Sequence, residues 1–344
     1  MIFNNTEHIL NMTQLSKSII NDLNLVTERF VIHLPFIFFI FGLIGFIGNL
    51  FTYLHAALRS NTCCIYSLCG SIIDIINLSL NLFARYLSQK YATHISWYSS
   101  RVTCKLNIFL LAFLPHLSIN FLLMATIDRF ACTCKLTSPI HRLNQLKTVP
   151  WMIIITIVSS CIASIYSAIL YDLVDGSLCI STQPQLNSIL YIILGGVMQP
   201  SLMLIFVLLT RRNVNHSKRR VGRVTATRGP HLQNQFILMI FSQVVVTAFL
   251  LLQWIIMYMY YAFTANYIRT VEQSSIISFV YKLTNYCYYL INVKSFYLSM
   301  LTSRLFRKTL INSLIEKLPR CMRPRFQILQ ATHSIVTLTN MRHP

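Results

Sequence analysis

Charged residues are scarce in this chain, and acidic residues are the scarcest. Of its 344 residues, 11% are charged and only 9 are Asp or Glu, whereas 55% are hydrophobic and the mean hydropathy is +0.57. Soluble globular domains carry roughly 25% charged residues. The composition therefore excludes an ordinary soluble domain and indicates a membrane protein.

Linkers, repeats and catalytic clusters are also missing. The sequence has no Gly- or Ser-rich linker, no repeat at a fixed period and no second domain. No cleavable signal peptide is visible at the start, so the first apolar run is expected to serve as the insertion signal. The adjacent Asp128 and Arg129 have no His or nucleophile placed to join them in general acid–base chemistry. We therefore expect one membrane domain that is not an enzyme.

Apolar runs long enough to cross a bilayer occur seven times. About 20 helical residues at 1.5 Å each cover roughly 30 Å of hydrocarbon. The seventh run is the least apolar, because Lys282, Asn285, Asn292 and Lys294 interrupt it. The sequence thus predicts an all-α fold, a bundle of seven transmembrane helices. The expected spans are 31–57, 64–87, 106–128, 149–171, 188–210, 235–262 and 276–301.

Basic residues are distributed unevenly between the two sides of these spans. The segments after spans one, three, five and seven hold most of the 29 Lys and Arg residues, which favours a cytoplasmic position for them. Asn4 and Asn11 lie in glycosylation sequons, which matter only outside the cell or in a lumen. We therefore expect a multi-pass plasma-membrane protein with an extracellular N-terminus and a cytoplasmic C-terminus. The net charge of +20 then reflects topology and the anionic lipid bilayer; nucleic acid, the alternative partner, would need a folded soluble domain.

Two cysteines are expected on the outer face. The other cysteines lie near the cytoplasmic face or inside spans, whereas Cys104 and Cys179 face out. Two cysteines in an oxidising compartment allow one pairing, and two free thiols are the alternative. A disulfide would tie the outer end of the third span to the following outer loop. It would fold residues 172–187 across the mouth of the bundle.

The residues after the seventh run are amphipathic. A short helix over 303–317 would suit the inner leaflet, with basic side chains on the remaining surface. Cys321 just beyond it can carry palmitate or remain a free thiol. The expected organisation is a glycosylated tail over 1–30, a receptor domain over 31–302, a membrane-parallel helix over 303–318 and a cytoplasmic tail over 319–344. The apolar side of the helix consists of Leu305, Phe306, Leu310, Leu314 and Ile315.

Several short motifs occur at related spacings. Asp128-Arg129-Phe130 stands at the cytoplasmic end of span three, and Cys104 precedes Arg129 by 25 residues. Trp97 precedes that cysteine by seven residues. Further features are Gly45, Gly48 and Asn49 in span one, Asp74 in span two, Pro200 in span five, and Phe306-Arg307 after span seven. The whole pattern resembles a rhodopsin-like G-protein-coupled receptor over about residues 30 to 320.

The resemblance implies a switch at Asp128, Arg129 and Phe130. In this family the acid and the arginine form a local pair, and the arginine exchanges that partner for other helices and the heterotrimeric G protein when the bundle opens. A charge pair with two arrangements of similar energy can be biased by ligand binding. Phe130 keeps the ring of the commoner tyrosine and lacks its hydroxyl. The alternative is a helix-end pair that stabilises membrane insertion.

The resemblance also supplies partners for Asp74. A charged residue at mid-membrane costs roughly 2.5 to 3.5 kcal/mol on insertion scales unless it has partners. In relatives such a cluster binds a sodium ion, the only cofactor expected here. Lys294 offers an alternative, because it can pair with Asp74 in place of the ion or extend to the interface. The expected cluster is Asn49, Asp74, Ser118 and Asn292 or Ser295.

Spans six and seven depart from the family pattern. Span six has Trp254 without the proline that the family places two residues later. Span seven has Ser295 and Tyr297 around the family's Asn-Pro-x-x-Tyr position, without the proline. Trp254 is therefore either a ligand-sensing ring or a packing aromatic, and activation by the usual tyrosine contact is not expected.

The resemblance also narrows the ligand. Leu111 stands where amine receptors have an aspartate, and Tyr289 where opsins have the Schiff-base lysine, so neither a monoamine nor retinal is expected. An acidic outer face with Asp172, Asp175 and Glu272, together with a tyrosine-rich pocket, suits a basic, amidated neuropeptide, and the chain looks most similar to invertebrate peptide receptors of the FMRFamide type. As an alternative to lining a ligand pocket, the tyrosines at the outer ends of the spans can form a belt at the membrane interface. The candidate pocket residues are Leu111, Trp254, Tyr258, Tyr261, Tyr288 and Tyr289.

The expected function is thus a G-protein-coupled receptor for an extracellular neuropeptide. A chemosensory receptor or a seven-span receptor that binds ligand without coupling is the nearest alternative, because the motifs of spans six and seven are altered. A transporter is more distant, since no inverted repeat is apparent.

Overall fold

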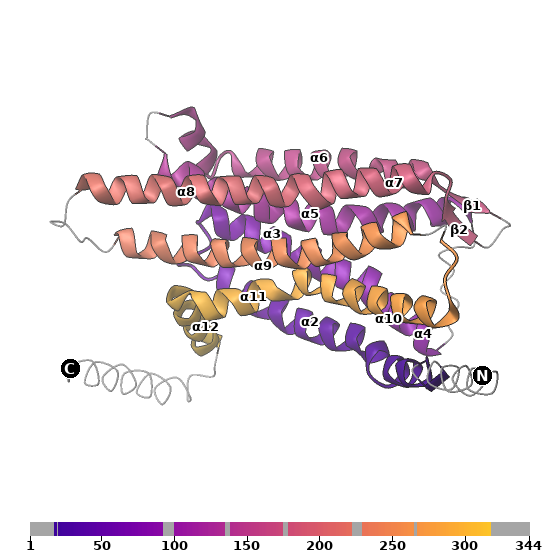
Figure 1. The fold of residues 1–344 in the computed structure, drawn as a ribbon. Coiled ribbons are helices and arrows are strands. Elements are labelled where there is room, and N and C mark those ends of the chain that lie inside the picture. Colours follow the sequence, from indigo (N-terminus) through magenta and orange to yellow (C-terminus); the bar gives the residue numbers. More distant parts are fainter. Residues whose placement is uncertain are drawn as a thin grey trace, which may run out of the picture.

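Long helices run side by side through the whole protein (Figure 1). The computed structural model describes residues 17–18, 20–91, 100–134, 138–174, 178–221, 229–264 and 267–317. Within these ranges the strands form a single antiparallel hairpin of β1 (Tyr171–Val174) and β2 (Leu178–Ser181). The protein is therefore all-α apart from this hairpin, as the apolar runs predict.

Six helices among the described residues are long and apolar enough to cross a membrane. Each overlaps one of the first six predicted spans, which identifies a multi-pass membrane protein. Most extend beyond the apolar run; the third, α5 (Arg101–Thr133), begins before its apolar run with a capping box of Ser100 and Thr103. The six are Ile20–Tyr53, Thr62–Ser88, Arg101–Thr133, Val149–Leu170, Pro184–His216 and Gln235–Phe263.

Two of these six helices contain a π-helical stretch. Leu78–Phe83 joins α3 to α4, and Ile192–Met198 joins α7 to α8. Both stretches replace the regular hydrogen-bond ladder for a few residues, as π-bulges do near functional sites. The helices within the spans are α2 (Leu34–Tyr53), α3 (Thr62–Asn77), α4 (Ala84–Tyr91), α5 (Arg101–Thr133), α6 (Val149–Leu170), α7 (Pro184–Tyr191), α8 (Gln199–Val221) and α9 (Gly229–Phe263). Two 3-10 helices, Val31–His33 and Pro139–Asn144, precede α2 and follow α5.

The seventh predicted span consists of two consecutive helices. They are α10 (Val271–Tyr288) and α11 (Leu290–Thr302), with Tyr289 between them. The 13 residues of α11 are too few to cross a bilayer alone, and α10 begins in polar sequence with Glu272 in its first turn. Neither helix is both long enough and apolar enough to count with the six.

Helix α2 packs very closely on its neighbours through glycines. A Cβ atom added at Gly48 would lie 2.2 Å from a ring carbon of Phe296 in α11, and one at Gly42 would lie 2.3 Å from Leu78. Small residues let helix backbones approach each other in a membrane protein. The glycines of the first span therefore bring α2 against α11 and the π-helical stretch.

A further helix follows the seventh run. It is α12 (Arg304–Lys317), and Figure 1 shows it at the end of the bundle opposite the hairpin. Phe306 is buried between the rings of Tyr53 and Phe296, and the Ser313 hydroxyl donates to the Phe51 carbonyl at 3.0 Å. Much of the predicted lipid-facing side thus packs on protein instead, because α12 folds back on the end of α2. Of that side, Phe306, Leu310 and Ile315 are buried, Leu305 is partly buried and Leu314 is exposed.

Candidate functional site

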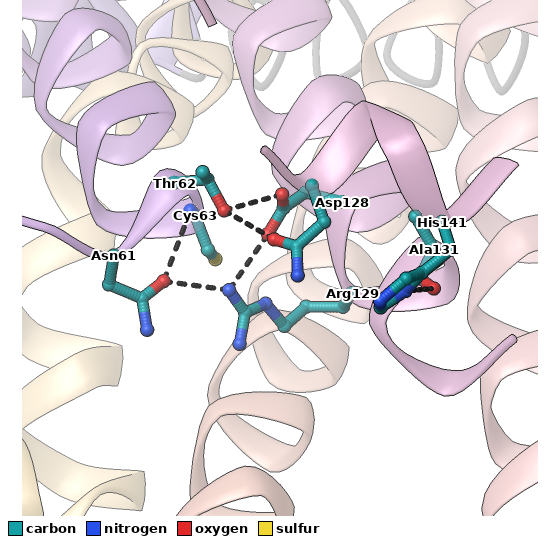
Figure 2. Close-up of polar contacts among 8 residues, drawn as sticks. Asn61, Thr62, Cys63, Asp128, Arg129, Ala131 and His141 are labelled. Carbon is teal, nitrogen blue, oxygen red and sulfur yellow. Dashed lines mark hydrogen bonds and ion pairs between the residues drawn. The ribbon is translucent and has the colours of Figure 1, made fainter. Parts of the chain in front are cut away.

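Asp128 and Arg129 form a buried ion pair near the end of α5 (Figure 2). Arg129 Nη2 lies 2.7 Å from Asp128 Oδ2, and the two side chains are 8% and 1% exposed. Thr62 of α3 places its hydroxyl 2.6 Å from Asp128 Oδ1. A buried ion pair needs such contacts because both charges have lost their water, and removing one partner of the pair costs about 3 to 5 kcal/mol. The predicted pair is therefore present, and a second helix holds it.

The start of α3 supplies the contacts to Arg129 (Figure 2). Asn61 caps α3, since its Oδ1 accepts from the Cys63 backbone N–H at 3.1 Å. The same oxygen accepts a hydrogen bond from Arg129 Nη2 at 2.7 Å. One cap oxygen thus serves both the helix and the guanidinium, so the start of α3 determines where Arg129 lies.

A third segment, the 3-10 helix after α5, lies next to this hydroxyl. The Thr62 hydroxyl is 2.7 Å from Asn144 Oδ1. A hydroxyl has one proton and a carboxylate is the stronger acceptor, so Thr62 donates to Asp128 and Asn144 is a close neighbour of the hydroxyl. Sequence reasoning missed Asn61, Thr62 and Asn144. An Asn directly before an apolar run is a helix N-cap signal and would have indicated the first of them.

An aromatic ring of another helix covers Arg129, and a ring of a further helix packs on the neighbouring Phe130. The Arg129 guanidinium lies 5.3 Å from the ring centroid of Phe236 in α9, within cation–π range. Phe130 packs against Phe206 of α8, with ring centroids 5.6 Å apart. Arg129 Nε has no hydrogen-bond partner in the described part of the chain. A displacement of α9 would therefore uncover a guanidinium that still has a donor to offer.

A small polar cavity of about 30 Å³ adjoins Asp74 in the middle of the bundle. The Ser118 hydroxyl donates a hydrogen bond to Asp74 Oδ1. Asn49 extends this network, because its Nδ2 lies 3.1 Å from Ser71 Oγ and 3.5 Å from Ser295 Oγ. The polar lining consists of Tyr66, Ser67, Ser71, Asp74, Ser118, Gln243, Thr247, Lys294 and Ser295.

Four of the five predicted cluster residues therefore meet, and Asn292 does not. Asn292 is buried and its Oδ1 has no hydrogen-bond partner among the described residues, but it does not line this cavity. Ser295 lines the cavity in place of Asn292. It lies three residues further along α11, on nearly the same helix face and about one turn away. Ser71 and Gln243 were not predicted.

Lys294 lies in the same cavity as Asp74. Its Nζ donates to the Ile291 carbonyl at 2.8 Å, and no ion pair within 4.0 Å joins it to Asp74 in the described chain. The oxygens of the cavity suit a monovalent cation. An ammonium group in so small a space opposes a second positive charge. The residues present therefore do not fit a sodium ion, and they favour the alternative in which Lys294 supplies the positive charge.

A larger cavity of about 310 Å³ lies among the helices near the hairpin. Leu111, Trp254, Tyr258, Tyr288 and Tyr289 line it, as predicted. The tyrosines among them face an interior space, which argues against a membrane-interface belt for these three. Other lining residues that sequence reasoning missed include Arg85, His116, Tyr166, Tyr171, Asn187, Tyr191, Gln199, Tyr281 and Asn285.

Tyr261 was predicted to line this cavity and does not. Its side chain is 44% exposed, and its ring packs on Tyr281 with centroids 4.8 Å apart. Tyr261 follows Tyr258 by three residues, which places it about one turn nearer the end of α9. The helix ends at Phe263, so Tyr261 lies beside the cavity wall and outside the lining.

Trp254 belongs to the cavity wall. Its indole Nε1 donates to the Tyr191 hydroxyl at 2.8 Å, and its ring lies 5.3 Å from that of Tyr281. The Tyr191 and Tyr258 rings are 5.1 Å apart. The cavity therefore has one continuous aromatic wall from α7, α9 and α10, in which Trp254 is 5% exposed.

The disulfide between Cys104 and Cys179 is present, with Cα atoms 5.8 Å apart, and confirms the predicted pairing. It fastens β2 to the first turn of α5. Arg101 holds β1 by donating two hydrogen bonds to the Asp172 carboxylate, which lowers the pKa of that carboxyl. The hairpin therefore lies at the end of the bundle where α5 begins (Figure 1). Tyr171 of β1 lines the 310 Å³ cavity beneath it.

Tyr297 faces away from the interior polar residues. Its hydroxyl donates to the Phe41 carbonyl of α2 at 3.0 Å. The altered span-seven motif made the family's usual tyrosine contact unexpected, and Tyr297 binds the backbone of α2. Several predicted features lie outside the described residues: Asn4, Asn11, Trp97, Asp175 and Cys321.

Comparison with known proteins yields no match, either to a protein-family model or to a curated protein. The function has to be inferred from the residues and contacts of the chain itself.

Proposed function

We propose that this chain is a seven-span receptor that couples an extracellular ligand to nucleotide exchange on a heterotrimeric G protein at the plasma membrane. The observation that carries the proposal is the buried pair of Asp128 and Arg129 on α5, because the same helix also lines the aromatic cavity. Leu111 lines the cavity, and its separation from Arg129 along α5 is roughly 27 Å at 1.5 Å per residue. A ligand in the cavity cannot touch the pair, so it acts by shifting an equilibrium between two arrangements.

In this proposal α10 and α11 together form the seventh span. They follow each other closely in line (Figure 1), and the backbone bonds Tyr289 N to Tyr286 O and Asn292 N to Tyr289 O carry the helical turn across the junction. Polar residues are tolerated in a span where they face a cavity instead of lipid. Asn285 and Tyr289 line the aromatic cavity, which meets this condition.

In the same proposal α12 lies along the inner leaflet. Ile311 and Leu314 are exposed on its outer side, and Phe306 attaches the helix to the bundle. The end of α8 and the segment after it are then cytoplasmic, in agreement with the basic residues Arg211, Arg212, Lys218, Arg219, Arg220, Arg223 and Arg228.

Helix α9 provides the mechanical link between ligand and switch. Trp254 lines the cavity, and Phe236 of the same helix covers the Arg129 guanidinium. A ligand that favours a different position of Trp254 would also favour a different position of Phe236. Moving Phe236 away would free Arg129 to leave Asp128 and contact a G protein.

Nucleotide exchange on purified G protein, with the receptor in lipid nanodiscs, tests this proposal. Arg129→Ala should abolish exchange, whereas Asp128→Asn should raise exchange without ligand, because it weakens the resting partner of Arg129. Arg59→Ala removes an exposed positive charge elsewhere on the proposed cytoplasmic face and should change neither. If both substitutions at the pair only reduce surface expression, the pair is an insertion anchor and the proposal is wrong.

A receptor that binds ligand without coupling, including a chemosensory one, is the second candidate. The contact of Tyr297 with Phe41 favours it, because the interior tyrosine contact used by the family is absent from the described residues. Specific ligand binding with no exchange on any G protein class would select this candidate.

The neuropeptide expected from the sequence is supported only in part. Asp172, one of the acids that suggested a basic peptide, is already bound by Arg101. Asp175 lies outside the described residues. The described lining of the cavity includes neither Asp nor Glu. We therefore propose an extracellular ligand of peptide or smaller size, with no requirement that it be basic.

A further inference from the structure

Arg85 is the one Lys or Arg side chain among the described residues that line the 310 Å³ cavity. It lies in the first turn of α4, directly after the π-helical stretch Leu78–Phe83. No acidic residue lines the same cavity in the described part of the chain. The described lining of the cavity therefore carries a net positive charge, supplied by the exposed residue Arg85.

No carboxylate in the described structure neutralises this charge. The ion pairs found there involve His55, Arg101 and Arg129, and none involves Arg85. Arg85 Nη1 lies 3.5 Å from Asn285 Oδ1, which is at the limit of a hydrogen bond. The guanidinium is exposed and retains most of its five donors for another partner.

The rest of the cavity supplies shape and apolar surface. The aromatic wall of Tyr191, Trp254, Tyr258 and Tyr281 and the apolar α5 residues Ile108 and Leu111 line the same space. Asn285 accepts from Arg85 through Oδ1, so its amide N–H₂ remains a donor close to the guanidinium. A planar guanidinium beside an amide donor matches the geometry of a carboxylate.

We infer that the ligand of this receptor carries a carboxylate next to an aromatic group, with Arg85 and Asn285 binding the carboxylate and the aromatic wall binding the ring. The inference rests on the proposed function in taking this cavity as the ligand site. A single permanently charged side chain suits a singly charged carboxylate better than a phosphate dianion. Such a carboxylate occurs in a small aromatic acid and at the free C-terminus of a peptide that ends in an aromatic residue.

Binding to the purified receptor in nanodiscs tests the inference with matched probes. The probes are N-acetyl-phenylalanine and an acetylated tripeptide ending in Phe, each as the free acid and as the C-terminal amide. Thermal stabilisation of the receptor and competition calorimetry measure binding without a G protein. Each acid that binds should bind at least about tenfold tighter than its amide, and the relative affinity of the two acids distinguishes a small acid from a peptide ligand.

Substitutions then connect the preference to Arg85. Arg85→Gln should remove the preference for acid over amide, whereas Arg85→Lys should retain part of it. Lys90→Gln removes an exposed cation of the same helix that does not line the cavity and should leave the preference unchanged. Melting curves without probe show whether each variant is folded; if Arg85→Gln is not, the comparison of Arg85→Lys with the wild type decides.

The inference is overturned if neither acid binds, if amides bind as tightly as acids, or if Arg85→Gln keeps the acid preference. Failure of the proposed function gives a different result. In that case acids bind with the expected preference, but no probe changes nucleotide exchange, and Arg129→Ala has no effect on exchange.

Discussion

Removing the Thr62 hydroxyl should activate the receptor without ligand. This hydroxyl joins α3 to Asp128 of α5 at 2.6 Å, in a place where the Asp128 side chain is 1% exposed. Valine has nearly the shape of threonine and lacks the donor. Thr62→Val therefore takes one hydrogen bond from the carboxylate that holds Arg129 and leaves the surrounding packing in place.

The size of the effect follows from the charge of the acceptor. A hydrogen bond to a charged group contributes about 1.5 to 3 kcal/mol. If the open arrangement lacks this bond, its loss destabilises only the closed arrangement. Since 1.4 kcal/mol is a factor of ten, the ratio of open to closed receptor should rise at least about tenfold.

The assay is ligand-free nucleotide exchange, normalised to receptor at the cell surface. Thr52→Val is the matched control, because the Thr52 hydroxyl is also buried but donates to the Gly48 carbonyl of its own helix at 2.8 Å. That bond is the same in any arrangement of the helices. The double variant Thr62→Val with Arg129→Ala should show no exchange. Basal exchange by Thr62→Val within about twofold of Thr52→Val would refute the reasoning.

Three further outcomes are expected. Agonist binding should be insensitive to sodium in the wild type, and Lys294→Met should create sodium sensitivity by removing the ammonium from the cavity of Asp74. If the wild type is sensitive to sodium and Asp74→Asn removes that sensitivity, the cavity binds sodium and this reasoning is wrong. Gly48→Leu should destabilise the folded protein by about 1 to 3 kcal/mol and so lower its melting temperature, because the added Cβ would lie 2.2 Å from a ring carbon of Phe296 in α11. An unchanged melting curve would contradict this. Arg101 lowers the pKa of Asp172 below its ordinary 3.8, so the pair stabilises the hairpin above that pH and loses its effect as the pH falls through the lowered value. The melting-temperature difference between the wild type and Asp172→Asn should therefore shrink on acidification. A constant difference would argue against the pair.

Hydropathy and local spacing by themselves determined the class of this protein. Runs of about 20 apolar residues can satisfy their backbone hydrogen bonds in lipid only as helices, so the apolar runs alone predicted the first six of the seven expected spans. Cys104 and Cys179 were the two cysteines left on the outer face, which allowed one pairing. The pair of Asp128 and Arg129 could be recognised because its members are adjacent in the sequence.

Only the tertiary structure decided what those residues touch. Asp128 meets Thr62 across a separation of 66 residues, and Arg129 meets Asn61 across 68. Such contacts depend on how each helix is rotated and how deeply it lies in the bundle, and an apolar run is compatible with any rotation. For the same reason the sequence could not show that Tyr261 lies outside the aromatic cavity or that Arg85 lines it. The position of one charged side chain among aromatic rings is set by the packing of several helices, and a linear pattern of hydropathy does not encode that packing.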